Sequence, residues 1–231
     1  MSARERKSRL QTYLMRAILI QELTPGVELD EAALCKAFDL SRTPVREVFR
    51  ELEGLGYVQL RENRGARVSD LSHTTLRDFF LTAPMVYGAI LRLAAVHASR
   101  VQIDTLKDAQ LQFRAALREG NPADRALANH RFHQITGDMA GNIYLLPSFE
   151  RLLIDHARIG VTFYRPTNGE MTENLSLASA QHDAIIDAIE SRNEIAAAKL
   201  ADDHWALSRD QIEQFVMPAP LDQSLGRDLG A

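Results

Sequence analysis

The 231-residue sequence predicts a mainly α-helical protein, with an N-terminal winged helix-turn-helix followed by an all-helical antiparallel bundle of about six helices. Two observations favour this fold class. Between residues 8 and 71, three short amphipathic segments precede two strand-like segments that flank a glycine-containing turn. From residue 72 to residue 218, apolar residues recur at helical spacing without strand-like alternation. We therefore expect one domain over residues 1–71, a second over residues 72–218, and a disordered tail over residues 219–231.

The composition limits the class of protein. Hydrophobic residues make up 45% of the chain and charged residues 25%, as in soluble globular proteins. No apolar run reaches the roughly 20 residues that a membrane helix needs, and residues 1–9 lack the apolar core of a secretory signal. The single cysteine, Cys35, excludes an internal disulfide and fits a reducing cytoplasm, which is the location that we expect.

The basic residues of this acidic chain are concentrated in one stretch. The net charge is −4, which argues against a generally basic surface for nucleic acid. Arginines nevertheless gather in one stretch, at positions 42, 46, 50, 61, 64 and 67. Strong binding through so small a basic surface would need two copies of the chain acting together, so we expect a homodimer.

The first two helices are predicted from apolar spacing and capping residues. A helix over residues 8–23 follows from the apolar positions 10, 13, 14, 17 and 18, and Thr24-Pro25-Gly26 ends it. Asp30 is the expected N-cap of a second helix, whose inner face comprises residues 33, 34, 37 and 38. Asp39-Leu40 makes a tight turn into the third helix, which is the spacing of a helix-turn-helix.

The third helix has an apolar stripe and an arginine face. We expect Thr43 as its N-cap and Pro44 as its first residue, with Gly54 and Gly56 at its end. The apolar stripe comprises Val45, Val48, Phe49, Leu52 and Leu55, and Arg42, Arg46 and Arg50 stand four residues apart on another face. Such a helix suits the DNA major groove, where arginine binds guanine edges or phosphates. The alternative is an ordinary salt-bridged surface helix, because Glu47, Glu51 and Glu53 lie among the arginines.

A hairpin after this helix favours the DNA-binding interpretation. Residues 57–60 and 66–69 read as two short strands, joined by a turn over residues 61–65 in which Gly65 supplies a positive φ and arginines lie at the tip. Three helices followed by such a hairpin predict a winged helix, whose wing reaches a neighbouring groove or phosphate.

Residues 18–71 resemble the DNA-binding domain of GntR-family bacterial transcription regulators. The resemblance rests on Leu23-Thr24-Pro25-Gly26, on residues 41–47, on Leu52, on Gly54-Leu55 and on the wing glycine Gly65. It implies that operator DNA is contacted by Arg42, Thr43, Arg46, Arg50, Arg64 and Gly65. A further contact made by some relatives would fall at Ala32, which cannot make it, so the detailed base code does not carry over.

Six helices are predicted in the second domain, over residues 74–99, 103–119, 122–139, 142–164, 173–191 and 194–215. Within them, Asn129 and His133 lie four residues apart on one helix face, and His204 follows His182 by 22 residues, across a predicted helix hairpin. These four side chains suit convergence on a metal inside a bundle. The alternative is that they are separate core or surface histidines, as we expect for residues 73, 97, 130 and 156.

The second domain resembles the FCD ligand-binding domain of the FadR-type branch of GntR regulators. The resemblance rests on residues 129–133, Gly141-Asn142, residues 181–189 and residues 198–204. It implies a divalent metal, Zn²⁺ or else Ni²⁺ or Mn²⁺, on His133, His182 and His204, with Asn129 at the position where many members have Asp. A neutral amide oxygen is a weaker ligand than a carboxylate, so we expect this site to hold its ion less tightly.

The effector positions differ from those of many relatives. Their Arg and Glu on the first helix of this domain fall at Ala83 and Tyr87, so the cation for a small carboxylate effector would come from Arg158 or Arg165 instead. We expect that effector in a pocket lined by Tyr87, Asn142 and Arg158, and Tyr87 leaves a larger or less acidic effector as the alternative. The resemblance implies a ligand-responsive regulator, with repression more usual than activation, on a pseudo-palindromic double-stranded operator.

Two other functions compete with this interpretation. A metal-dependent hydrolase with an accessory DNA-binding module would use the three histidines, but the sequence lacks His-Glu-x-x-His and Gly-x-Ser-x-Gly motifs. A winged helix that contacts protein rather than DNA is the third possibility.

Overall fold

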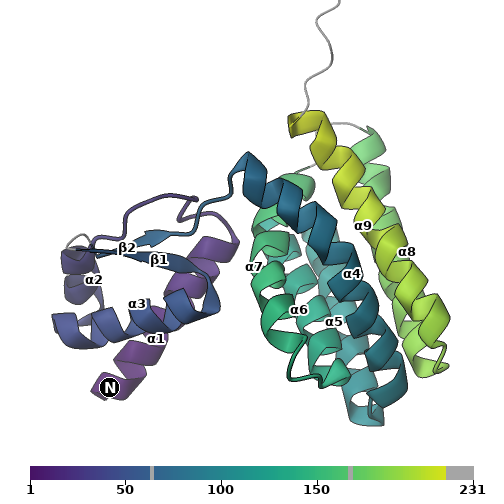
Figure 1. The fold of residues 1–231 in the computed structure, drawn as a ribbon, viewed down its shortest axis with the longest axis horizontal. Coiled ribbons are helices and arrows are strands. Elements are labelled where there is room, and N and C mark those ends of the chain that lie inside the picture. Colours follow the sequence, from purple (N-terminus) through teal and green to yellow (C-terminus); the bar gives the residue numbers. More distant parts are fainter. Residues whose placement is uncertain (63–64, 166–168, 217–231) are drawn as a thin grey trace, which may run out of the picture.

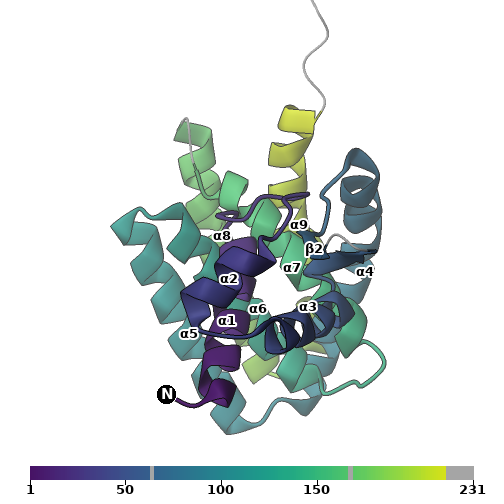
Figure 2. The same ribbon diagram turned by 90° about the vertical axis from the view of Figure 1, so that its left-hand side faces the viewer.

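The computed structural model describes residues 1–62, 65–165 and 169–216. The predicted wing-tip contact Arg64 and the predicted tail over residues 219–231 lie outside these ranges. The described part is mainly helical, with one small sheet, which confirms the predicted fold class. Figure 1 shows the winged helix on one side of the helical bundle, and Figure 2 shows the same arrangement with the winged helix toward the viewer.

The winged helix contains three helices and a two-stranded sheet. Its elements are α1 (Ala3–Leu19), α2 (Glu31–Phe38), α3 (Arg42–Leu55), β1 (Val58–Arg61) and β2 (Gly65–Val68). The strands are antiparallel, with Val58 opposite Val68 and Arg61 opposite Gly65. The segment before α2 extends this sheet, because the Leu29 N–H donates to the Ala66 carbonyl at 2.8 Å and the Val68 N–H to the Val27 carbonyl at 2.9 Å.

Two predicted helix starts in the winged helix are wrong. Helix α1 begins at Ala3 rather than near residue 8, because Ser2 and Glu5 form a capping box that pairs two backbone N–H groups at the helix start. Helix α3 begins at Arg42 with Ser41 as its N-cap, so Thr43 is not the cap. Pro44 then takes the third helical position, where its missing N–H is still one of the four that have no intrahelical acceptor. The predicted cap Asp30 is confirmed, and so is the end of α3 at Gly56, where φ is 89°. Gly54, which was also predicted to end α3, lies inside it.

Six helices form the bundle: α4 (His73–His97), α5 (Arg100–Glu119), α6 (Pro122–Ala140), α7 (Leu146–Phe163), α8 (Gly169–Glu190) and α9 (Glu194–Val216). The predicted start of α7 at residue 142 is wrong, because the Asn142 side-chain oxygen accepts from the N–H groups of Tyr144 and Leu145 and holds a turn there. Helix α8 begins at Gly169, four residues earlier than predicted.

Helix α4 is long and apolar enough to span a membrane by length and composition alone, although Arg77, Asp78 and Arg92 interrupt its apolar residues. In the fold it packs against α9 and α6, and Ala83, Tyr87, Ile90 and Leu91 on it are buried in the bundle core. Its apolar character is that of a core helix.

Helix α7 joins the two parts of the molecule. The core of the winged helix includes Ile154 and Ala157, which belong to α7. Arg158, on the same helix, donates through Nη2 to the Ser69 carbonyl at 2.6 Å and through Nη1 to Asp155 Oδ1 at 2.9 Å. Its guanidinium is fully buried, so the junction is both apolar and ionic.

Candidate functional site

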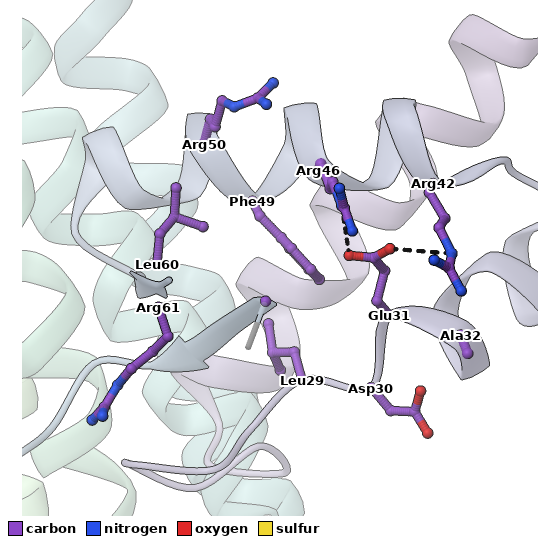
Figure 3. A pocket seen from close by; sticks show the side chains of 11 residues that line it. Leu29, Asp30, Glu31, Ala32, Arg42, Arg46, Phe49, Arg50, Leu60 and Arg61 are labelled. Carbon is purple, nitrogen blue, oxygen red and sulfur yellow. Dashed lines mark hydrogen bonds and ion pairs between the residues drawn. The ribbon is translucent and has the colours of Figure 1, made fainter. Parts of the chain in front are cut away.

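The arginine face of α3 borders an open cleft of about 680 Å³. Figure 3 shows this cleft between α3, the start of α2 and the wing. Its lining comprises Leu29, Asp30, Glu31, Ala32, Arg42, Arg46, Phe49, Arg50, Leu60, Arg61 and Gly65. Phe49 is buried and holds α3 against the core, and the arginine side chains of α3 remain exposed.

The arginines of α3 differ in their partners. Arg46 Nε donates to Glu31 Oε2 at 2.9 Å, and Arg42 Nε lies 3.6 Å from Glu31 Oε1. The hydrogen bond that Arg46 donates to the Glu31 carboxylate raises the pKa of Arg46. Arg50 points away from Glu31 in Figure 3. Thr43 is exposed at the start of the helix, and Gly65 has φ of 78° at the start of β2.

The glutamates of α3 face a different neighbour. Lys7 of α1 donates to Glu47 Oε2 at 2.9 Å and to Glu51 Oε1 at 2.8 Å. Glu53 Oε1 accepts from the Leu60 N–H at 3.1 Å. These three acidic side chains therefore bind other elements of the winged helix, which weakens the interpretation of α3 as a surface helix with mutually paired charges.

A second candidate site lies inside the bundle. His133 of α6, His182 of α8 and His204 of α9 each offer one ring nitrogen, and these three atoms lie within 4.8 Å of one another. All three residues are buried. The structure thus brings together the three histidines that were predicted to converge on a metal.

Two glutamines fix the ring orientation of two of these histidines. His182 Nδ1 lies 3.0 Å from Gln110 Oε1, and Gln110 Nε2 donates to the Ser179 carbonyl at 2.9 Å. Likewise His204 Nδ1 lies 2.9 Å from Gln181 Oε1, whose Nε2 donates to the Asp203 carbonyl. Because each glutamine oxygen is the acceptor, each Nδ1 carries the proton and each Nε2 presents its lone pair.

The remaining polar atoms of the cluster suit a cation. His182 Nε2, both ring nitrogens of His133 and Asn129 Oδ1 are buried with no hydrogen-bond partner among the described residues. Burial lowers the pKa of His133 and His182 well below the usual value and that of His204 to about 4, so the rings are neutral at pH 7. Neutral imidazoles and an amide oxygen are ligands for a divalent metal, and leaving them unpaired costs free energy.

A fourth histidine, His156, belongs to this cluster, although it was predicted to be a separate core or surface residue. The ring centroids of His156 and His133 lie 4.9 Å apart. His156 Nδ1 lies 3.0 Å from the Tyr87 hydroxyl, and Asn129 Nδ2 lies 3.5 Å from His156 Nε2. If the Asn129 amide donates to His156, its oxygen is left for an ion. Burial lowers the pKa of His156 to about 3.

The three residues predicted for the effector lie in different environments. Tyr87 is buried, and its ring contacts His133 and His156 with centroids 5.5 and 5.6 Å away. Asn142 holds the turn before α7, and Arg158 is engaged at the junction with the winged helix. Beside His156 and His204 lies a small cavity of about 10 Å³, which is room for about one water molecule.

Comparison with known proteins identifies both domains. Residues 6–68 match the family described as bacterial regulatory proteins, gntR family, and residues 85–207 match the FCD domain. The chain is 27% identical over 180 residues to the HTH-type transcriptional repressor RspR of Escherichia coli K12, covering 77% of this chain and 79% of that one. It is 29% identical over 231 residues to the HTH-type transcriptional repressor NanR of Citrobacter rodentium, covering 87% and 84%.

A solved structure shows the same fold. Escherichia coli McbR/YncC superposes with a TM-score of 0.73 at 16% identity, covering 92% of this chain and all of that one.

Proposed function

This chain belongs to the gntR family of bacterial regulatory proteins and carries an FCD domain, so it is a transcription regulator rather than an enzyme. We propose that it works in the cytoplasm as a homodimeric repressor on a pseudo-palindromic operator, and that a small carboxylate effector in the bundle controls it. The exposed arginine face of α3 carries this proposal.

The DNA contacts follow from the shape and charge of that face. Helix α3 enters the major groove, where Arg42 and Arg46 bind base edges and Arg50 binds a phosphate. The flanking sugar-phosphate backbone of the DNA is bound by Thr43, by Arg64 and by the main chain of the wing near Gly65. One α3 reads only a few base pairs, so a second copy one helical turn away supplies the remaining affinity.

The histidine cluster holds a divalent metal, with His133, His182 and His204 as nitrogen ligands and Asn129 as an oxygen ligand. Zn²⁺ fits three imidazoles best, and Ni²⁺ or Mn²⁺ are the alternatives. Within the described part of the chain, Asn129 Oδ1, His182 Nε2 and the unprotonated ring nitrogen of His133 are buried without a partner, which supports this assignment. The bound ion supplies a positive charge to a cluster of neutral rings, which favours an anionic effector. Tyr87 lies at the cluster and would contact that effector.

Signals from this cluster reach the winged helix through α7. His156 faces the cluster, and Ile154, Ala157 and Arg158 on the same helix contact the winged helix. If DNA also binds the protein more tightly at one position of α7 than at another, an effector that prefers one of these positions changes the affinity for DNA. DNA then changes the affinity for the effector by the same factor.

The test is selection of bound duplexes from a random library by purified protein, with native mass spectrometry of the same sample. We expect an inverted repeat with half-sites about one helical turn apart, and a dimer that carries about one metal ion per chain. A library that shows no enrichment would contradict the DNA-binding proposal, and a metal-free protein after incubation with Zn²⁺ would contradict the metal site.

A further inference from the structure

Two carboxylates, those of Asp30 and Glu31, line the DNA-facing cleft, and Glu31 is the one that lies among its arginines. The Glu31 side chain is 16% exposed, whereas those of Arg42 and Arg46 are 73% and 57% exposed. Figure 3 shows both arginines directed toward Glu31, which lies between them. A negative charge at a surface that binds phosphates weakens the binding, so Glu31 needs a different explanation.

The contacts of Glu31 are with one nitrogen of each arginine. They join Glu31 Oε2 to Arg46 Nε at 2.9 Å and Glu31 Oε1 to Arg42 Nε at 3.6 Å. A guanidinium has five N–H donors, so the two terminal nitrogens of each arginine keep theirs. Arginine reads guanine by two parallel bonds to O6 and N7. A carboxylate that engages Nε leaves such a pair of donors available and restricts the rotation of the side chain.

Glu31 is itself held in place from two sides. It is the first residue of α2, next to the N-cap Asp30, whose side chain accepts from the Ala33 N–H at 2.9 Å. Just before it, the Leu29 N–H is bonded to Ala66 of β2. The carboxylate thus has a fixed position relative to both α3 and the wing, and so can orient the arginines.

We propose that Glu31 is a specificity-determining residue, which orients Arg42 and Arg46 for base reading and lowers their attraction to phosphates. The proposal rests on the proposed function of α3 in DNA binding. Two consequences follow. The oriented arginines lose less side-chain freedom on the correct sequence, which favours specific binding. The carboxylate offsets one of the four arginine charges of the cleft, at residues 42, 46, 50 and 61, which weakens binding to any other sequence.

Three variants separate orientation from charge. Glu31→Gln removes the charge and weakens the hold on both arginines. Glu31→Asp keeps the charge but shortens the side chain by one methylene. Glu47→Gln is the matched control, because it removes the same charge from α3 where Glu47 binds Lys7 and leaves the contacts of Arg42 and Arg46 intact. Circular dichroism and thermal unfolding show that each variant is folded.

Affinity is measured by fluorescence anisotropy for the duplex selected by the wild-type protein and for a scrambled duplex. We expect Glu31→Gln to lower the ratio of the two affinities by roughly tenfold or more and to bind the scrambled duplex more tightly, with a salt slope steeper by about 1. Glu31→Asp should lower the ratio without tighter scrambled binding. Glu47→Gln should keep the wild-type ratio.

An unchanged ratio in both Glu31 variants would overturn the inference while the DNA-binding proposal stands. An equal fall of the affinity ratio in Glu47→Gln would also overturn the inference, because loss of a negative charge alone would then explain the result for Glu31→Gln. If the wild-type protein does not distinguish the two duplexes, the proposed function fails first, and the inference fails with it.

Discussion

Replacing Arg158 by methionine tests the ionic part of the junction between the bundle and the winged helix. The wild-type guanidinium is fully buried and binds Asp155, whose side chain is 6% exposed, and the Ser69 carbonyl. Methionine fills much of the same volume but offers no donor. Asp155 then keeps Arg151, at 3.0 Å and 38% exposed, as its partner, and the Ser69 carbonyl loses a hydrogen bond.

The expected loss is large for a single substitution. Breaking a buried ion pair by removing one partner costs about 3–5 kcal/mol, because the other charge is left buried. The remaining bond from Arg151 reduces that cost, so we expect the free energy of unfolding to fall by about 3 kcal/mol. Urea unfolding followed by far-ultraviolet circular dichroism measures this change.

The loss of stability in Arg158→Met should depend on pH. Burial raises the pKa of Asp155, whereas Arg151 and Arg158 lower it, so loss of Arg158 raises that pKa further. A carboxyl group whose folded pKa exceeds its unfolded value destabilises the fold once pH rises through the unfolded pKa. The gap between wild-type and variant should therefore shrink from pH 8 to pH 4.5.

A double variant, Asp155→Leu with Arg158→Met, removes both charges and should recover much of the lost stability. A loss below about 1 kcal/mol in Arg158→Met, against the 3–5 kcal/mol of a broken buried pair, or a double variant as unstable as the single one, would refute the reasoning.

Three further predictions concern the two sites. Arg46→Ala should weaken binding to the selected duplex by at least about 1 kcal/mol and relax base preference, whereas Arg77→Ala, on an exposed arginine of α4, should leave both unchanged in anisotropy titrations. His182→Ala should lower metal content in elemental analysis and abolish effector response while basal DNA binding persists, and loss of DNA binding with metal retained would contradict this. The free energy of unfolding of the metal-free protein, measured with urea, should decrease as pH falls below about 6.5. In the folded protein His156 and His204 stay neutral there, because burial lowers their pKa to about 3 and 4, whereas in the unfolded chain both take up protons. A flat stability profile between pH 7.5 and 5 would show that these rings are not held neutral by the fold.

Local signals were sufficient to predict the elements of the winged helix. The apolar stripe, the Asp30 cap and the glycine after α3 are local in sequence, and the structure has the cap, Gly56 and four of the five stripe residues buried. The start of α1 was also readable, because Ser2 and Glu5 have the spacing of a capping box. Choosing Ser41 rather than Thr43 as the cap of α3 needed the geometry of the turn.

Tertiary packing decided what the sequence could not show. The spacing of His133, His182 and His204 follows helix geometry, so their approach was predictable. His156 and Gln110 lie on other helices, α7 and α5, at no diagnostic interval, and only the packing of the bundle brings them to the cluster. The same holds for Arg158, whose partner Ser69 lies 89 residues away in the chain.

The most direct test of the central claim is a salt titration of DNA binding by the metal-loaded protein, on the selected duplex and on a scrambled one. The account predicts affinity that falls steeply as salt rises and a preference for the selected duplex of roughly a thousandfold or more. Equal affinity for both duplexes, or binding that does not weaken with salt, would contradict it and would favour a winged helix that contacts protein instead.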